Sequence, residues 1–312
     1  MLECPRGVRF PEPSLTPRRK DLQRTLRSSV RCSGIALHSG LAVAMTLLPA
    51  PADSGIVFRR ADRGGAEIAA SWRNAVPARL CTTLRNTEGV TIATVEHLLA
   101  ALAGCGIDNA VVEVDGPELP AMDGSAAPFV SLIEEAGTVV QDRPRRAIRV
   151  LEPVEVADGE RSVRLVPGEV FAVTVEIDHP LSLTSLQRFT ATLDRFRAEV
   201  APARTYGFLE DAEQLRAAGL ARGASLQNVV VVDKGGIVNA DGLRYPDEFA
   251  RHKVLDAIGD LYLAGGPLIG RFEGRHSGHA LNHRVLAALF ERPNAWRHET
   301  ARTARDAREP AV

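Results

Sequence analysis

The sequence predicts an α+β protein made of two β-α sandwich domains of similar topology, with the helices packed between two sheets. Two observations support this fold class. Short strands precede helices in residues 23–143, and the same order returns in residues 144–298. Between the halves, the polar and basic segment 141–146 contains Pro144 and is the best candidate for a linker. No residue-by-residue similarity relates the two halves, so the repeat rests on the order of elements alone.

The first half alternates apolar and polar residues as strands do before its helices begin. A turn at Gly34–Gly40 and a loop at Asn86–Gly89 join neighbouring strands. The expected strands span residues 25–35, 42–48, 55–60, 82–85, 90–94 and 110–114. A Leu- and Ala-rich run predicts a helix over 95–103. A second helix is expected over 126–136, with Pro128 near its start, where proline is tolerated.

The second half repeats this plan. Its expected strands span residues 147–156, 162–166, 172–177, 187–192 and 229–232. Its expected helices span residues 193–201, 209–218, 248–264 and 279–290. The helix over 248–264 lacks proline and has an apolar side, which favours a helix over a strand.

Composition excludes several classes of protein. The chain of 312 residues carries 38 basic and 39 acidic side chains, so no global field attracts nucleic acid. No run of about 20 apolar residues is present to span a membrane. The four cysteines are widely spaced, which is typical of a reducing cytoplasm rather than a disulfide framework. Residues 1–22 are expected to form a disordered extension, and residues 299–312 a flexible tail.

The segment Phe249–Ile258 is the most informative stretch. His252 and Asp256 are four residues apart, so a helix places both on one face, and Asp260 follows one turn later. An imidazole and a carboxylate so placed can bind zinc. Lys253 lies about 100° round the helix from this pair and is expected to point elsewhere, toward an anion such as a phosphate. Taken alone, the His-x-x-x-Asp spacing is more often a surface ion pair.

Three other segments carry titratable or polar groups that packing explains poorly. Glu96 and His97 begin an otherwise apolar helix, although His97 could simply cap the first turn. His279 stands at the start of the last helix, where the helix dipole lowers a histidine pKa unless a carboxylate offsets it. Thr205 could donate a hydrogen bond to a developing oxyanion, or serve only as a cap.

Together these residues describe a hydrolytic zinc site. His97, His252 and Asp256 are the candidate ligands, which leaves a fourth position for water. Glu96 is the candidate general base, and His279 can protonate the departing amine. Asp260 could hold the ring of His279 and favour its charged form.

Several longer motifs occur in a fixed order along the chain. They are Gly34–Gly40, Thr94–Leu98, Ile107–Asn109, Pro120–Phe129, Ala203–Phe208, Arg251–Leu261 and Ser277–Asn282. From about Gln23 to Trp296 the chain closely resembles the UDP-3-O-acyl-N-acetylglucosamine deacetylases, zinc amidases that commit Gram-negative bacteria to lipid A synthesis. The resemblance implies a fold of two β-α sandwich domains with helices between two sheets.

The resemblance also implies roles for individual residues. His97, His252 and Asp256 match the zinc ligands, with iron(II) as the alternative metal. Glu96 matches the general base, His279 the acid with Asp260 beside it, and Thr205 the threonine that stabilises the oxyanion. The matches to substrate-contacting positions are Lys253 for the diphosphate, Phe208 and Asp211, and His38, whose role is less defined.

The family's acyl-chain passage is built from an insertion that corresponds here to residues 209–230. Leu215, Leu220 and Leu226 are the expected lining. Tyr206 stands where phenylalanine is expected and adds a hydroxyl beside the substrate, and Ala224 replaces a usual glycine. Both departures put the preferred acyl length in doubt.

The resemblance implies a UDP-linked acylated amino-sugar as substrate. It implies a cytoplasmic monomer without stable membrane insertion, although peripheral contact with the inner membrane fits an acylated substrate. The alternative is a zinc-loaded homologue that binds substrate without turnover, against which Glu96 argues. The chain has no HExxH motif, which disfavours a metalloprotease.

Overall fold

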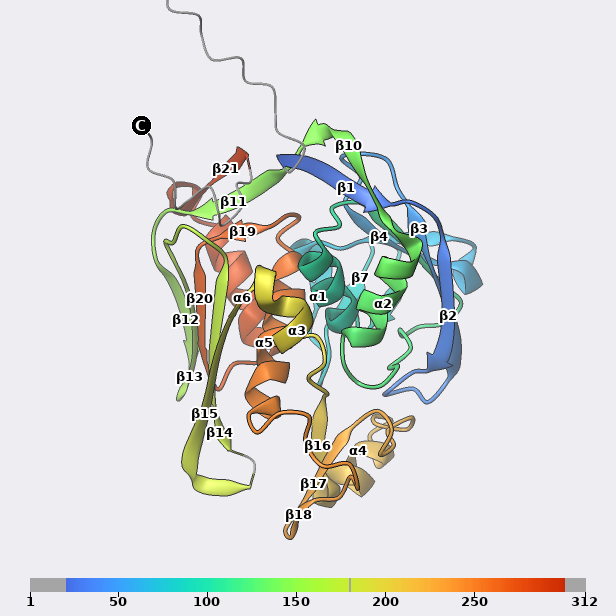
Figure 1. The fold of residues 1–312 in the computed structure, drawn as a ribbon, viewed down its shortest axis with the longest axis vertical. Coiled ribbons are helices and arrows are strands. Elements are labelled where there is room, and N and C mark those ends of the chain that lie inside the picture. Colours follow the sequence, from blue (N-terminus) through green and yellow to red (C-terminus); the bar gives the residue numbers. More distant parts are fainter. Residues whose placement is uncertain (1–20, 180, 301–312) are drawn as a thin grey trace, which may run out of the picture.

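The computed structural model describes residues 21–179 and 181–300, so the predicted extension up to residue 20 and the tail from 301 lie outside it. Helices occupy the space between two five-stranded sheets, and a small subdomain projects from one end of the molecule (Figure 1). Within the described residues no helix is both long and apolar enough to cross a membrane.

The two five-stranded sheets have the same topology. The first runs in the order β2-β3-β9-β4-β5 and the second in the order β12-β13-β20-β14-β15. In each sheet one inner pair is parallel, β4 with β9 and β14 with β20, and the other pairs are antiparallel. The strands of the first sheet are β2 (Val30–Ile35), β3 (Ala42–Pro49), β4 (Ile56–Arg60), β5 (Ala66–Ala69) and β9 (Ala110–Val114). Those of the second are β12 (Val154–Asp158), β13 (Arg161–Val166), β14 (Ala172–His179), β15 (Ser182–Thr192) and β20 (Arg271–Arg275). The predicted α+β class with two similar β-α halves is confirmed.

The helices follow the same plan. Helix α1 precedes β9 and α5 precedes β20, while α2 and α6 follow those strands. The bounds are α1 (Glu96–Cys105), α2 (Ala127–Ala136), α3 (Phe196–Glu199), α5 (Glu248–Tyr262) and α6 (His279–Phe290). Helices α1 and α5 pack against each other in the centre of the molecule and are buried on nearly all sides. Such a position suits apolar side chains, so the acidic residues and histidines that α5 buries require a specific explanation.

Three smaller sheets complete the frame. They are β1 (Leu22–Leu26) with β10 (Thr138–Pro144); β6 (Ala75–Val76), β7 (Thr83–Arg85) and β8 (Thr91–Ala93); and β19 (Leu268–Ile269), β11 (Arg146–Val150) and β21 (Trp296–Thr300). The predicted linker at 141–146 is not an unpaired loop, because most of it lies in strands that pair with β1 and β21. Pro144 is accommodated because it ends a strand in a two-stranded ribbon. The predicted strand 147–156 is two strands, separated at residues 151–153, and the chain is still paired at residues 299 and 300.

The projecting subdomain comes from the segment between α3 and α5. It contains β16 (Tyr206–Phe208), α4 (Ala212–Ala217), β17 (Val230–Asp233) and β18 (Gly236–Ile237). Strand β16 pairs with β17 in parallel, so a strand lies between the helices expected over 193–201 and 209–218. Short 3-10 turns lie at Ala61–Arg63, Trp72–Asn74, Leu193–Arg195, Leu209–Asp211 and Pro293–Ala295.

Gly259 lets α1 and α5 approach closely. A Cβ atom added at Gly259 would lie 2.0 Å from the carbonyl oxygen of Glu96, too close for any side chain. Gly259→Ala is therefore expected to force the helices apart and destabilise the fold by about 1–3 kcal/mol. Urea unfolding measures this. Gly235→Ala is the matched control, because a Cβ there meets nothing within 4 Å; equal unfolding midpoints for the two variants would contradict the prediction.

Candidate active site

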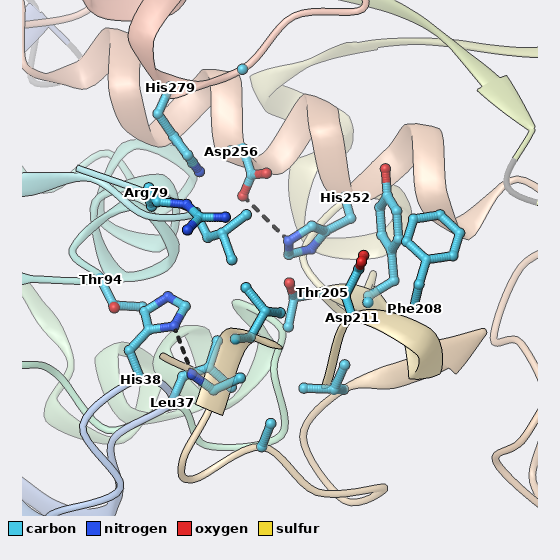
Figure 2. Close-up of a pocket in the computed structure, with 18 of the residues that line it drawn as sticks. Leu37, His38, Arg79, Thr94, Thr205, Phe208, Asp211, His252, Asp256 and His279 are labelled. Carbon is cyan, nitrogen blue, oxygen red and sulfur yellow. Dashed lines mark hydrogen bonds and ion pairs between the residues drawn. The ribbon is translucent and has the colours of Figure 1, made fainter. Parts of the chain in front are cut away.

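One pocket of about 870 Å³ collects most of the predicted site residues. It lies where α1, α5 and the start of α6 meet the small subdomain. The predicted residues on its wall are His38, Glu96, His97, Thr205, Tyr206, Phe208, Asp211, His252, Lys253, Asp256 and His279. Asp260 is not on the wall but lies beneath it, fully buried against His279. Figure 2 shows His252, Asp256 and His279 facing the same space.

Three buried side chains converge at the junction of α1 and α5. Oδ1 of Asp256 lies 3.3 Å from Nε2 of His252 and 3.6 Å from Nε2 of His97. The imidazole rings of His97 and His252 are nearly perpendicular, with centroids 4.9 Å apart. One potential ligand atom from each of the three residues lies within 4.8 Å of the other two. Helical spacing brings Asp256 to His252, whereas His97 arrives through the packing of α1 on α5.

The chemistry of this donor set fits a divalent metal ion. Nδ1 of His252 lies 3.0 Å from the carbonyl oxygen of Ala203, so Nδ1–H donates there and the Nε2 lone pair faces His97 and Asp256. Burial lowers the pKa of His252 to about 4, so the ring is neutral, as a metal ligand must be. Two imidazole nitrogens and a carboxylate oxygen suit Zn²⁺ and also Fe²⁺.

From its position on the helix, Lys253 was expected to point away from His252 and Asp256. The structure contradicts this expectation. Its Nζ donates to Oδ2 of Asp256 at 2.9 Å, an i to i+3 contact that a long side chain can reach. This bond occupies the oxygen of Asp256 that faces away from the two histidines. Lys253 therefore borders the candidate ligand group directly, and its Nζ also lies 5.7 Å from the ring centre of Tyr206.

Glu96 lies beside the candidate ligands at the start of α1. Its side chain is almost fully buried, and its Oε2 accepts a hydrogen bond from the backbone N–H of Thr82 at 3.0 Å. Its other oxygen, Oε1, lies 3.9 Å from Nε2 of His279 across the pocket. Burial raises the pKa of Glu96, which makes the carboxylate a better proton acceptor.

His279 and Asp260 form a close charged pair. Nδ1 of His279 donates to Oδ2 of Asp260 at 2.8 Å, and Nδ2 of Asn282 donates to the same oxygen at 2.8 Å. Burial opposes the charged imidazolium, but Asp260 outweighs burial and raises the pKa of His279 to about 9. The dipole at the N-terminus of α6 alone would lower the pKa of His279, but the Asp260 carboxylate offsets the dipole. His279 is thus positively charged at neutral pH, with Nε2 toward Glu96.

The remaining predicted residues form the wall toward the subdomain. His38 donates its backbone N–H to Glu118, its Nε2 is buried without a hydrogen-bond partner, and burial lowers its pKa. The ring of Tyr206 meets Phe249 edge-to-face at 4.8 Å between centroids. The backbone N–H of Thr205 bonds to the carbonyl of Gly124, which fixes this turn at the pocket.

Part of the pocket wall is apolar, and much of this part comes from the small subdomain. It includes Leu37, Leu80, Leu209, Leu215, Ala224, Leu226, Val229, Val231 and Val238. Two of the three leucines expected to line a passage, Leu215 and Leu226, are among them. Leu220 is not, so that part of the expectation is wrong.

Sequence reasoning missed two residues around Asp260. Thr82, fully buried just before β7, bonds to Asp260, and His283 lies one turn after His279 on α6. The i to i+4 spacing of His279 and His283 was a usable signal for the second imidazole. No local pattern marks Thr82, because the contact joins residues 178 positions apart.

Comparisons with known proteins agree with this geometry. The family model for UDP-3-O-acyl N-acetylglycosamine deacetylase (LpxC) matches residues 23–291. A relative from Phenylobacterium zucineum is 49% identical over 282 residues, covering 89% of this chain and 96% of the relative. One from Saccharophagus degradans is 50% identical over 281 residues, covering 88% of this chain and 92% of the relative. Both relatives are named UDP-3-O-acyl-N-acetylglucosamine deacetylase. The resemblance of the sequence motifs is confirmed, and the chain belongs to the LpxC family of deacetylases.

Proposed function

We propose that this protein hydrolyses the N-acetyl group of UDP-3-O-(3-hydroxyacyl)-N-acetylglucosamine, which gives UDP-3-O-(3-hydroxyacyl)-glucosamine and acetate, the committed step of lipid A biosynthesis. The names of the relatives support the substrate. The observation that carries the reaction type is the placement of Glu96 and His279 on one pocket beside the buried His97–His252–Asp256 group. A carboxylate base and a charged histidine serve no purpose in a purely structural metal site.

We assign His97, His252 and Asp256 as ligands of one zinc ion per chain, with Fe²⁺ as the alternative. A bound divalent ion would supply Lewis-acid chemistry, polarising the amide carbonyl and lowering the pKa of water. The protein's part is to hold the donor atoms. Ala203 orients His252, and Lys253 neutralises charge on Asp256.

The proton transfers are assigned to Glu96 and His279. Glu96 accepts a proton from the attacking water as the new C–O bond forms, and Thr205 donates a hydrogen bond to the oxyanion of the tetrahedral intermediate. His279, charged because of Asp260, then donates the proton on its Nε2 to the sugar nitrogen as the C–N bond breaks. The products are acetate and the free amine.

The substrate's other parts are assigned to the pocket wall. His38, Tyr206, Phe208 and Asp211 are assigned to contacts with the substrate. Lys253, whose ammonium donates to Asp256 in this structure, is assigned to the side of the site that faces the diphosphate. The acyl chain is assigned to the apolar part of the wall, much of which comes from the small subdomain. Both halves of the chain then contribute to the site, Glu96 from residues 23–143 and His279 from residues 144–298.

The test of this function is acetate release from the proposed substrate by the purified protein, before and after chelation and with zinc added back. Turnover that chelation abolishes and zinc restores is the expected result. A folded, zinc-loaded protein that binds the substrate without releasing acetate would favour the alternative, a substrate-binding homologue. Substrates with shorter and longer acyl chains distinguish that outcome from a mismatch in chain length.

The dependence of kcat/KM on pH is expected to be bell-shaped. Glu96 must be deprotonated, so its raised pKa sets the acidic limb. His279 must be protonated, so activity falls as the pH rises through its pKa of about 9. Asp260→Asn removes the attraction that raises this pKa and leaves burial to lower it, so the alkaline limb should move to lower pH. An alkaline limb that stays in place in this variant would exclude His279 as the acid.

A further inference from the structure

Thr82 joins the two groups that carry protons in the proposed reaction. Its backbone N–H donates to Oε2 of Glu96 at 3.0 Å, and its hydroxyl donates to Oδ1 of Asp260 at 2.5 Å. The residue is fully buried, and it immediately precedes β7, in the first half of the chain. Asp260 and its partner His279 belong to the second half. Thr82 is thus a direct link between the proton acceptor on α1 and the carboxylate behind the proton donor on α6.

The hydrogen bonds around Asp260 fix the direction of the Thr82 hydroxyl. Oδ2 of Asp260 already accepts from His279 and from Asn282, each at 2.8 Å. An ionised carboxylate accepts hydrogen bonds and cannot donate them, so the Thr82 hydroxyl hydrogen must point at Oδ1. Its lone pairs are then free for a donor on the other side. Asp260 is held through both of its oxygens, and rotation of the carboxylate is blocked.

His283 is placed to be that donor. Its Nε2 lies 3.1 Å from the Thr82 hydroxyl oxygen and 3.6 Å from Oδ1 of Asp260. An oxygen that gives its hydrogen to Asp260 can only accept from the ring, so His283 carries a proton on Nε2. The hydrogen bonds run in one direction, from His283 to Thr82 and from Thr82 to Asp260. Two histidines one helical turn apart on α6 therefore meet the same carboxylate, His283 through Thr82 and His279 directly, with Nδ1 of His279 also 3.3 Å from the Thr82 hydroxyl oxygen.

We propose that Thr82 is a positioning residue of the deacetylase. Thr82, oriented by His283, sets the placement of the Glu96 carboxylate relative to the His279–Asp260 pair. The inference rests on the proposed function. Its physical basis is that water attack and amine departure need Glu96 and His279 on opposite sides of one small group, where a shift of about 1 Å can cost about 100-fold in rate. Threonine suits this task because its branched Cβ restricts χ1 and holds the hydroxyl in place.

The test compares Thr82→Val with Thr82→Ser. Valine keeps the shape and loses the hydroxyl, so kcat is expected to fall by about 10- to 100-fold, as for outer-shell hydrogen-bond partners, with KM little changed. Serine keeps the hydroxyl and is expected to restore most of the parent kcat. Thr83→Val is the matched control, since the Thr83 hydroxyl contacts only Cys81 among the hydrogen bonds found in the described residues, and it should match the parent.

The outcomes separate the two proposals. An inactive parent protein would count against the deacetylase function itself. An active parent with an equally active Thr82→Val variant would overturn the positioning role, as would a serine variant impaired as strongly as the valine variant. If Thr82→Val does not fold, Thr82→Ala removes the same hydroxyl without adding a methyl group against Asp260. Failure of both to fold, with Thr82→Ser fully active, would make the hydroxyl a requirement of folding and also overturn the proposal.

Discussion

Replacing Glu96 by glutamine is expected to lower kcat by about 10²- to 10⁴-fold, the contribution of a well-placed general base. Glutamine has nearly the same shape but cannot accept a proton. The hydrogen bond from the backbone N–H of Thr82 can persist to the amide oxygen, so the side chain should keep its position. His97, the neighbouring candidate ligand, is unchanged, and the metal content should remain that of the parent. KM should change little, because Glu96 acts on water rather than on the bound sugar.

The measurement is steady-state deacetylation together with metal analysis of the same sample. Glu113→Gln is the matched control, because it makes the same chemical change on β9, away from the pocket. The Glu113 carboxylate is partly exposed and lies 3.7 Å from the guanidinium of Arg59. That variant should keep the parent kcat and metal content. A Glu96→Gln protein with full metal content and near-parent kcat would remove Glu96 from the mechanism. A variant that had lost its metal would instead indicate that Glu96 is a ligand.

The elements that the sequence predicted well are those whose pattern is local. Helix α6 and strand β9 begin and end at the predicted residues, because each has an apolar run and clear boundaries. Strands β5, β19 and β21 were not predicted. They are short, and what makes them strands is pairing with distant segments such as β4 and β11. The repeated strand order of the two sheets is likewise invisible in residue identities, since each half fills its sheet with different apolar side chains.

The site residues also divide into those that a local pattern predicts and those that depend on contacts between distant segments. Helical spacing was enough to place His252, Asp256 and Asp260 on one face of α5, as the contacts from Asp256 and Asp260 to residues around the pocket show. Spacing was not enough for Lys253, whose flexible chain folds back to Asp256 although its Cα lies off that face. Thr82 could not be found at all, because its hydroxyl matters only once the residue before β7 meets Asp260 on α5 and His283 on α6. Site residues that depend on tertiary contact need the fold before they can be named.

Replacing His252 by alanine is expected to abolish metal binding and, with it, turnover. The variant leaves only His97 and Asp256 as candidate ligands, and metal affinity should fall by more than the roughly 10- to 100-fold typical of losing an outer-shell partner. Among the candidate ligands, His252 suits this test best because three observations fix its ring. Ala203 takes its Nδ1 proton, burial keeps the ring neutral with a pKa of about 4, and Nε2 faces Asp256 at 3.3 Å.

Two readouts are needed, one of them independent of activity. Elemental analysis of protein purified without added metal should find close to one zinc or iron ion per parent chain and almost none in His252→Ala. The thermal unfolding temperature of the parent should rise when zinc is added, and that of the variant should not. The expected stabilisation of the parent is about 2.7 kcal/mol when free zinc is 100 times its dissociation constant. His298→Ala is the matched control, because this exposed histidine on β21 lies in a different pocket. A His252→Ala protein with full metal content would rule out ligation by His252, and the His97–Asp256 pair would then have to recruit its third ligand from elsewhere on the pocket wall.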